Sequence, residues 1–289
     1  MKILIIGSNG FIGSYLVGYF SKRCEVWEMD IVLDYNNPRF ISFEDMEKHK
    51  FDFCVNCSGA ANVSFSLQNP YNDFNLNTFN VFKFLENIRM HNPDCKFINI
   101  SSAAVYGNPI ELPIKENAPL VPVSPYGYHK LQAEQICEEF NRFFGIKTVS
   151  LRVFSAYGDG LRKQLFWDLY QKFTKESAIE LWGTGEESRD FIHINDIAQI
   201  VELTMQHSSF NAQVVNVANG EQVKISEAVD TFHKLLGTNK SYSFNNKSTV
   251  GYPINWEADI SLIKSWGYKK NVYLEHGLEQ YIKWAKQNV

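Results

Sequence analysis

Three evenly spaced glycines near the start of the chain constrain its fold more than any other feature. Gly7, Gly10 and Gly13 directly follow the apolar segment Lys2–Ile6 and open a segment of helical periodicity, Phe11–Ser21. One glycine permits a tight turn, one lets phosphate approach the backbone, and one lets helix and strand pack closely. Free N–H groups at the start of a helix also attract anions. The spacing therefore predicts a strand–turn–helix unit that binds a dinucleotide.

An acidic residue at the end of the next apolar segment indicates which dinucleotide binds. Asp30 lies twenty residues after Gly10, at the end of the predicted strand Glu25–Met29. A carboxylate at this place accepts hydrogen bonds from the ribose hydroxyls and repels a 2′-phosphate. The following residues, 31–33, are Ile, Val and Leu, so no cation is available there for such a phosphate. We predict NAD as the cofactor in preference to NADP.

The first half of the chain alternates short apolar segments with helical patterns. Apolar strands that alternate with helices predict an α/β fold with a parallel sheet covered on both faces. Right-handed crossovers then give a doubly wound sheet of the Rossmann type. The predicted strands are Lys2–Ile6, Glu25–Met29, Phe53–Asn56, Phe97–Ile100 and Thr148–Val153, and the predicted helices are Phe11–Ser21, Tyr71–Met90 and Tyr126–Phe144.

The pattern changes after about Gly158, where helical segments mix with short runs and loops. We expect residues 1–158 to form the NAD-binding Rossmann domain, to which the chain returns at about 190–216. Residues 159–289 are expected to form mainly a smaller C-terminal, substrate-binding lobe. The helices expected in this part are Leu161–Lys175, Asn195–Gln206, Ile225–Leu236 and Leu274–Lys286.

Composition excludes several other classes of protein. The chain is 45% hydrophobic and 21% charged, which is typical of a folded globular protein. Its formal net charge of -4 gives no electrostatic attraction to nucleic acid or an anionic membrane. The apolar run at residues 3–6 is too short for a signal peptide, and no run is long enough for a membrane span. Five scattered cysteines, read as buried thiols rather than metal ligands, favour a reduced cytoplasm.

A tyrosine and a lysine four residues apart carry the candidate chemistry. Tyr126 and Lys130 lie one turn apart on a predicted helix that Pro125 precedes, and Ser102 ends a predicted strand upstream. A free tyrosine, with a pKa near 10, is a poor base at neutral pH. A cation about 4 Å away, at an effective dielectric near 20, contributes roughly 4 kcal/mol, or about three pK units. We therefore expect Lys130, helped by the positive nicotinamide ring, to lower the pKa of Tyr126, which would act as a general base while Ser102 binds the same substrate oxygen.

With these motifs in place, the sequence resembles the extended short-chain dehydrogenase/reductase family, the NAD-dependent epimerase/dehydratase group. The resemblance runs nearly end to end. Its motifs are G-S-N-G-F-I-G at 7–13, C-S-G-A-A at 57–61, S-S-A-A-V-Y-G at 101–107, P-Y-G-Y-H-K at 125–130, L-R-V-F-S-A-Y-G at 151–158 and G-T-G-E-E-S-R-D-F-I-H-I-N-D at 183–196. Asn77 resembles the structural asparagine of the family.

The resemblance implies a set of site residues and no metal ligand. The implied catalytic residues are Ser102, Tyr126 and Lys130. The implied NAD-binding residues are Gly7, Asn9, Gly10, Phe11, Ile12, Gly13, Asp30, Ser58, Gly59, Ala60, Tyr126, Lys130 and Phe154. The implied substrate-binding residues are Ser102, Ala103, Tyr126, Ser155 and Arg189.

Arg189 is assigned to a nucleotide diphosphate because a guanidinium offers a fork of donors to phosphate. A salt bridge with Asp190 or another acidic residue is the alternative role for Arg189. Asp190 and Asp196 are expected to stabilise the loop and cap the next helix, and His193 is expected to be structural.

Departures from the family pattern narrow the expected reaction. Members that dehydrate the sugar carry Asp-Glu after the catalytic hydroxyl, whereas this chain has Ala103 and Ala104. A methyl group moves no proton, so we expect neither dehydration nor decarboxylation. Ser155 stands where the family often has Asn. The late Arg-Pro-Gly-Asp element is poorly kept in 251–256, where Tyr252 and Trp256 are candidates for base or ribose contacts, although core packing is favoured for both.

The resemblance favours an NAD-dependent nucleotide-sugar epimerase, acting at C4 through a transient 4-keto sugar. The alternative is an NAD(H)-dependent nucleotide-sugar 4-ketoreductase or dehydrogenase, which shares the Ser, Tyr and Lys residues. A third hypothesis is a non-catalytic protein that only binds nucleotide. The substrate partner implied is a nucleotide-diphosphate sugar.

The family resemblance also implies a homodimer, because its members pair through a four-helix seam. Apolar residues on the two long predicted helices are expected to divide between the sheet and that seam: Phe74, Phe79, Phe82, Phe84, Leu131, Ile136, Phe140 and Phe144.

Overall fold

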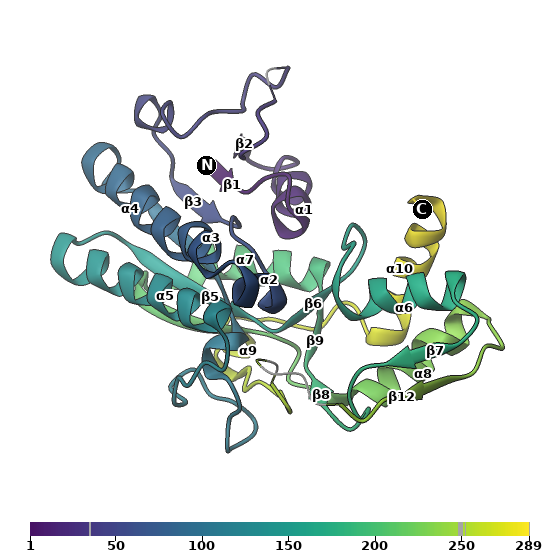
Figure 1. Ribbon diagram of the computed structural model, residues 1–289. Coiled ribbons are helices and arrows are strands. Elements are labelled where there is room, and N and C mark those ends of the chain that lie inside the picture. Colours follow the sequence, from purple (N-terminus) through teal and green to yellow (C-terminus); the bar gives the residue numbers. More distant parts are fainter. Residues whose placement is uncertain (35, 248–250, 252, 289) are drawn as a thin grey trace.

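A six-stranded parallel sheet forms the centre of the computed structural model, which describes residues 1–34, 36–247, 251 and 253–288 (Figure 1). The strand order is β10-β5-β4-β3-β1-β2, and every neighbouring pair is parallel. The strands are β1 (Lys2–Ile6), β2 (Glu25–Met29), β3 (Phe53–Asn56), β4 (Lys96–Ser102), β5 (Thr148–Val153) and β10 (Asn211–Val217). This arrangement confirms the predicted Rossmann-type sheet.

Helices cover both faces of the sheet, as the apolar strands require. One face packs in a core that includes Leu16 of α1 (Phe11–Phe20) and Val201 of α7 (Ile194–His207). The other face packs in a core that includes Leu85 of α4 (Asn80–His91) and Cys137 of α5 (Pro125–Phe144). The apolar side chains of the two long predicted helices divide between sheet and solvent: Phe84 and Phe140 are buried, whereas Phe74, Phe79, Phe82 and Phe144 are exposed.

The order of the strands reverses between β1 and β3. Both β2 and β3 pair with β1, but β2 follows α1 on one side and β3 lies on the other. In open parallel sheets of this kind, ligands bind beyond the carboxyl ends of the strands at such a reversal point. The turns after β1 and β3 are therefore the places where a cofactor site is expected.

A third hydrophobic cluster lies outside the sheet and gathers elements from the second half of the chain. It includes Phe166 of α6 (Gln164–Lys175), Phe232 of α8 (Ile225–Leu236) and Tyr281 of α10 (Leu274–Asn288). Figure 1 shows these helices beside the sheet, with the C-terminus on α10. Three small sheets belong to this half: β6 (Ser155–Tyr157) with β9 (Phe191–His193), β7 (Ile179–Leu181) with β12 (Tyr242–Phe244), and β8 (Ser188–Arg189) with β11 (Val223–Lys224).

Two predicted helices differ from the structure by more than two residues at an end or are interrupted. The predicted helix Tyr71–Met90 is divided into α3 (Pro70–Phe74), a π-helical segment η2 (Asn75–Phe79) and α4. The predicted helix Leu161–Lys175 begins only at Gln164. The remaining helical elements are α2 (Val63–Gln68), α9 (Ser261–Ser265), and the short segments η1 (Met46–Lys48) and η3 (Ala103–Tyr106). Within the described residues, no helix is both long and apolar enough to cross a membrane.

Candidate active site

The turns after β1 and β3 lie in direct contact at the reversal point of the sheet. Gly7 has a φ of +79°, and a Cβ at this position would lie 2.7 Å from the backbone nitrogen of Ser58. A Cβ on Gly13 would overlap the carbonyl oxygen of Gly7. These two glycines therefore allow the helix, the first turn and the 57–61 turn to approach one another without side chains between them.

The start of α1 has the properties of a phosphate site. Gly10 is its N-cap, and in α1, all of which the structure describes, no side chain caps the helix and no acidic residue lies in the first turn. Free backbone N–H groups and the positive end of the helix dipole suit a diphosphate. Phe11 and Ile12 open this helix, so their main chain is where the predicted phosphate contacts would be made.

Asp30 is placed beside the glycine turn, one residue beyond the end of β2. Its carboxylate accepts hydrogen bonds from the backbone N–H of Asn9 at 2.9 Å and from that of Ile31 at 2.7 Å. The side chain of Asn9 donates to the carbonyl oxygen of Val32. The strand end and the glycine turn are thus tied together, with a carboxylate in the position that the adenosine ribose of a dinucleotide requires. The residues of this region fit NAD.

The predicted catalytic residues converge at the carboxyl end of β4. Ser102 ends this strand, and Ser124 caps α5 by accepting a hydrogen bond from the N–H of Gly127 at 3.2 Å. A Cβ on Gly127 would lie 2.6 Å from the carbonyl oxygen of Ala104, so the glycine lets the first turn of α5 approach the Ser102 turn closely. Tyr126 lies on this first turn, where the Ser102 side chain acts to lower the pKa of the tyrosine.

Lys130 reaches from the next turn of α5 toward the cofactor turn. Its Nζ donates a hydrogen bond to the carbonyl oxygen of Ile100 at 2.9 Å and lies 3.5 Å from where a Cβ on Gly59 would be. Ser58 packs against Gly7, and Gly59 is the residue after Ser58. The 57–61 turn therefore lies between Lys130 and the glycine turn. The structure therefore brings together Tyr126, Lys130, Ser102 and the two turns.

The predicted lowering of the Tyr126 pKa is wrong for the polypeptide itself. Burial raises the pKa of Tyr126 to about 12, and the Ser102 side chain opposes this only in part. Burial also lowers the pKa of Lys130 to about 8, against the attraction of Asp73, Cys57 and Glu134. The prediction from the sequence rested on an attraction between the two side chains and left out the cost of burying both, which is the largest influence on each pKa in the structure.

Asn77 connects the cofactor turn to the helix layer. Its Nδ2 donates to the carbonyl oxygen of Ala60 at 3.1 Å and to Oδ1 of Asp73 at 3.1 Å. A Cβ on Gly59 would overlap the Asn77 side chain. These contacts are consistent with the structural role that the family resemblance implied for Asn77. Asp73 and its partner His129 were not singled out from the sequence, although Asp73 and Asn77 have the i, i+4 spacing of one helix face.

Arg189 joins two segments that are far apart in the sequence. Its Nη1 donates to the carbonyl oxygens of Ser188 and Ile254, and its guanidinium lies 5.6 Å from the ring centroid of Trp256. Trp256 is buried, and its Nε1 donates to the carbonyl oxygen of Gly107. Trp256 therefore packs in the core, as expected. Tyr252 lies outside the described residues. The diphosphate contact of Arg189 stays a prediction.

The two aspartates of the 183–196 motif hold loops, as expected, but neither is the N-cap of α7. Asp190 accepts backbone hydrogen bonds from residues 219, 220, 221 and 258, and Asp196 accepts them from residues 271 and 272. His193 is the N-cap, where its Nδ1 accepts from the N–H of Asn195. Burial lowers the pKa of His193 to about 4, so it is neutral and structural at neutral pH.

Three predicted contact residues offer little side-chain surface to a ligand. Ala103 is fully buried, and Phe154 packs in the core between Tyr106 and Trp256. Any contact of these two with substrate or cofactor would have to come from the main chain. Ser155 is half-buried and opens β6, where its N–H donates to the carbonyl oxygen of Asp190. Its predicted substrate contact stays a prediction.

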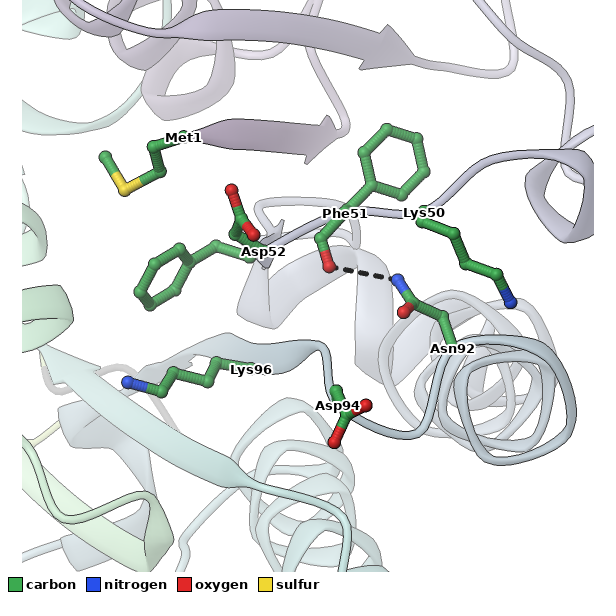
Figure 2. A pocket seen from close by; sticks show the side chains of 8 residues that line it. Met1, Lys50, Phe51, Asp52, Asn92, Asp94 and Lys96 are labelled. Atoms are coloured by element: carbon green, nitrogen blue, oxygen red, sulfur yellow. Dashed lines mark hydrogen bonds between the residues drawn. The ribbon is translucent and has the colours of Figure 1, made fainter.

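A separate surface hollow lies at the opposite edge of the sheet. Figure 2 shows its lining, which includes Met1, Asp52 and Lys96, near the amino ends of β1, β3 and β4. Asn92 donates a hydrogen bond to the carbonyl oxygen of Phe51 across this region. Because the predicted residues gather at the carboxyl ends of the strands, this hollow is not part of the candidate active site.

Comparison with known proteins decides the family. The model of the NAD dependent epimerase/dehydratase family matches residues 3–218. The chain belongs to this family. The prediction of an NAD-dependent enzyme of the extended short-chain dehydrogenase/reductase type is thereby confirmed, and the family bears out NAD as the cofactor.

Relatives within this family match over the whole chain. A Methanocaldococcus jannaschii protein that is provisionally named a UDP-glucose 4-epimerase is 27% identical, covering 99% of each chain. The solved UDP-glucuronic acid 4-epimerase from Bacillus cereus, in complex with UDP-glucuronic acid and NAD, is 26% identical and has a TM-score of 0.89, covering 99% of each chain. The UDP-N-acetylglucosamine 4-epimerase from Methanobrevibacter ruminantium is 24% identical, covers 100% of this chain and 99% of that one, and shares the fold with a TM-score of 0.89.

Proposed function

We propose that this enzyme is an NAD-dependent UDP-sugar 4-epimerase. The observation that carries the proposal is the convergence of Ser102, Tyr126 and Lys130 beside the Gly7 and Gly59 turns in a member of the epimerase/dehydratase family. Relatives named for UDP-glucose and UDP-glucuronate epimerisation support both the reaction at C4 and the uridine diphosphate part of the substrate.

The chain's own groups have distinct proposed roles. Tyr126 takes the proton from the sugar O4 and later returns it, while Ser102 hydrogen-bonds the same oxygen. Lys130, protonated, stabilises the Tyr126 phenolate by its positive charge. NAD, when bound, supplies the hydride acceptor and donor at the same carbon. The keto sugar must stay in the site and present its other face before the hydride returns. The C-terminal lobe is proposed to exclude water around this intermediate during that time.

The proposed cofactor contacts follow the two turns. The main chain at Asn9, Gly10, Phe11, Ile12 and Gly13 would hold the diphosphate, and Asp30 the adenosine ribose. Ser58, Gly59 and Ala60 would line the other side. We assign the nucleotide diphosphate of the substrate to Arg189, because its fork of donors suits phosphate oxygens.

The residues after Ser102 argue against elimination chemistry. Ala103 and Ala104 carry only methyl groups, so this turn offers no acid or base for a proton at C5 or C6 of the sugar. Loss of water or of carbon dioxide from the keto sugar is therefore not part of the proposed reaction.

The proposal extends to organisation and location. Residues 1–158, with 190–216, are proposed as the NAD-binding domain, and the rest of 159–289 as mainly a substrate-binding lobe. We propose a homodimer in the cytoplasm, formed through the exposed aromatic residues of the α3–α4 and α5 helices. The proposed partner in solution is a nucleotide-diphosphate sugar rather than nucleic acid or membrane.

Incubation of the purified protein with single UDP-sugars tests the function. We expect conversion of one sugar to its C4 epimer, seen by NMR or chromatography, with no net change in the amount of NAD or NADH. A 4-ketoreductase or dehydrogenase would instead change one nucleotide per product, which would contradict the epimerase proposal. Appearance of a 4-keto-6-deoxy sugar would show that the enzyme dehydrates its substrate, which would also contradict the proposal.

A further inference from the structure

A buried carboxylate lies on the helix layer directly behind the catalytic residues. Asp73, on α3, is fully buried, and its Oδ2 lies 2.5 Å from Nδ1 of His129. The backbone of His129 is held in turn, because its carbonyl oxygen accepts a hydrogen bond from Oγ1 of Thr78 at 2.9 Å. His129 directly precedes Lys130 on α5, so the pair ties α3 to the catalytic helix.

The second oxygen of Asp73 is also held. Oδ1 accepts a hydrogen bond from Nδ2 of Asn77, four residues later, on the π-helical segment η2. The same Nδ2 donates to the carbonyl oxygen of Ala60 in the cofactor turn. A Cβ on Gly59 would overlap Oδ1 of Asn77 and would lie 3.5 Å from Nζ of Lys130. Asp73 is therefore fixed at the centre of a network that reaches the catalytic lysine.

The charges that face Lys130 differ in how they are compensated. Glu134, on the next turn of α5, forms an ion pair with Arg152 at 2.7 Å, so a permanent cation balances it. Asp73 has a histidine, His129, as its partner at 2.5 Å in place of an arginine. A carboxylate in a low-dielectric interior acts over several ångströms on neighbouring ionisable groups. Its charge raises the pKa of both Lys130 and Tyr126.

We propose that Asp73, held by His129 and Asn77, is a positioning residue that keeps Lys130 in its ammonium form beside Tyr126. The importance of this role for catalysis rests on the proposed function, since the reaction needs an ammonium at Lys130 only if Tyr126 is the base. Burial alone favours a neutral lysine, and the Asp73 carboxylate opposes that tendency. Asp73 has no contact with the substrate in this role and acts through Lys130.

Asp73→Asn is the direct test, because it keeps the shape and removes the charge. Loss of a negative charge weakens the ammonium form of Lys130 and favours the phenolate form of Tyr126. Titration of Lys130 by NMR, with labelled lysine and assignment through Lys130→Arg, is expected to move down by at least about 0.5 pH unit. The pH–rate profile for kcat is expected to move to lower pH on both limbs.

Two further variants make the test robust. Asp196→Asn also converts a buried carboxylate into an amide, but its partners are the backbone N–H groups of residues 271 and 272, so we expect a loss of stability without a shift of the Lys130 titration. The double variant Asp73→Asn/His129→Gln replaces the pair by two amides that can bond to each other, for use if the single variant does not fold. It is expected to show the same downward shift.

An unchanged Lys130 titration in a folded Asp73 variant overturns the proposal, and so does an equal shift in Asp196→Asn. The lysine titration needs no substrate, so it reports on this proposal even if no UDP-sugar is epimerised. Failure of epimerisation with a shifted titration would refute the proposed function and leave the electrostatic role of Asp73 intact.

Discussion

The ammonium group of Lys130 donates a hydrogen bond to the carbonyl oxygen of Ile100, across 2.9 Å. This bond anchors the turn of α5 that carries the proposed catalytic residues to the end of β4, two residues before Ser102. The partner of this buried amine is thus a neutral carbonyl and not a carboxylate. Among the residues that the structure describes, no negative charge at hydrogen-bond distance offsets the cost of burying the ammonium, and burial lowers the pKa of Lys130.

The activity is expected to fall on the alkaline side at about pH 8. Burial lowers the pKa of Lys130 to about 8, so the ammonium is present below that pH and is lost above it. Lys130→Arg keeps a permanent charge and should remove this alkaline limb while lowering the maximal rate. The pH dependence of kcat for both proteins checks this, and an identical alkaline limb in the variant would show that Lys130 is not the group that titrates.

Tyr126→Phe is expected to lower the rate of epimerisation by about 10²–10⁴-fold, because it removes the proposed general base. Most of the NAD should still be retained on the purified protein, since the proposed diphosphate and adenosine ribose contacts are untouched. Tyr128→Phe is the matched control, because Tyr128 lies on the same helix and is half-exposed. Comparable losses in both variants would contradict the role of Tyr126.

Gly13→Ala is expected to destabilise the fold by about 1–3 kcal/mol and to reduce NAD retention. The added methyl would overlap the carbonyl oxygen of Gly7, so the glycine turn must move. Gly18→Ala, in the same helix, meets no atom within 4 Å and should stabilise by roughly 0.5–1 kcal/mol. Chemical denaturation of both variants gives the free energies of unfolding, and equal effects would refute the steric account.

His193 should make the free energy of unfolding fall as the pH is lowered from about 6.5 to 4. The unfolded chain takes up a proton near pH 6.5, whereas burial holds the pKa of the folded His193 at about 4. His193→Asn keeps a capping side chain and should reduce this fall by up to about 3 kcal/mol. His207→Asn, at an exposed histidine on the same helix, should keep the fall that the burial of His193 causes, and denaturation at several pH values distinguishes the two variants.

Phe79→Glu is expected to convert the proposed dimer into a monomer. Phe79 lies among the exposed apolar residues of the two long helices, and a charge there would have to be buried in the helix seam. Ile110→Glu is the control, because Ile110 is fully exposed on a loop outside these helices. Light scattering at micromolar concentration gives the mass, and a monomeric unmodified protein would contradict the dimer.

Much of the site follows from short-range rules that the sequence carries. The bounds of β1, β2, β3 and β5 agree with prediction, because four-to-six-residue apolar segments between turns have few alternatives. Gly7, Gly10 and Gly13 predict a phosphate turn by their spacing and their place after a strand. Tyr126 and Lys130 predict a catalytic helix only together with Pro125 before them and Ser102 upstream.

Other features depended on which segments meet in space. The pairing of Asp73 with His129, the contact of Gly59 with Asn77 and Lys130, and the bond from Arg189 to Ile254 each join residues from separate elements. The direction of the Tyr126 pKa also needed the fold, because it depends on how deeply the hydroxyl is buried as well as on its neighbours. The sequence alone determined five strands of the central sheet and the glycine turn, since these depend on neighbours along the chain, but it did not indicate β10 or the short strands of the second half. Only the tertiary structure decided the burial and charge around the reactive groups, because the electrostatic cost of burial depends on atoms that are distant in sequence.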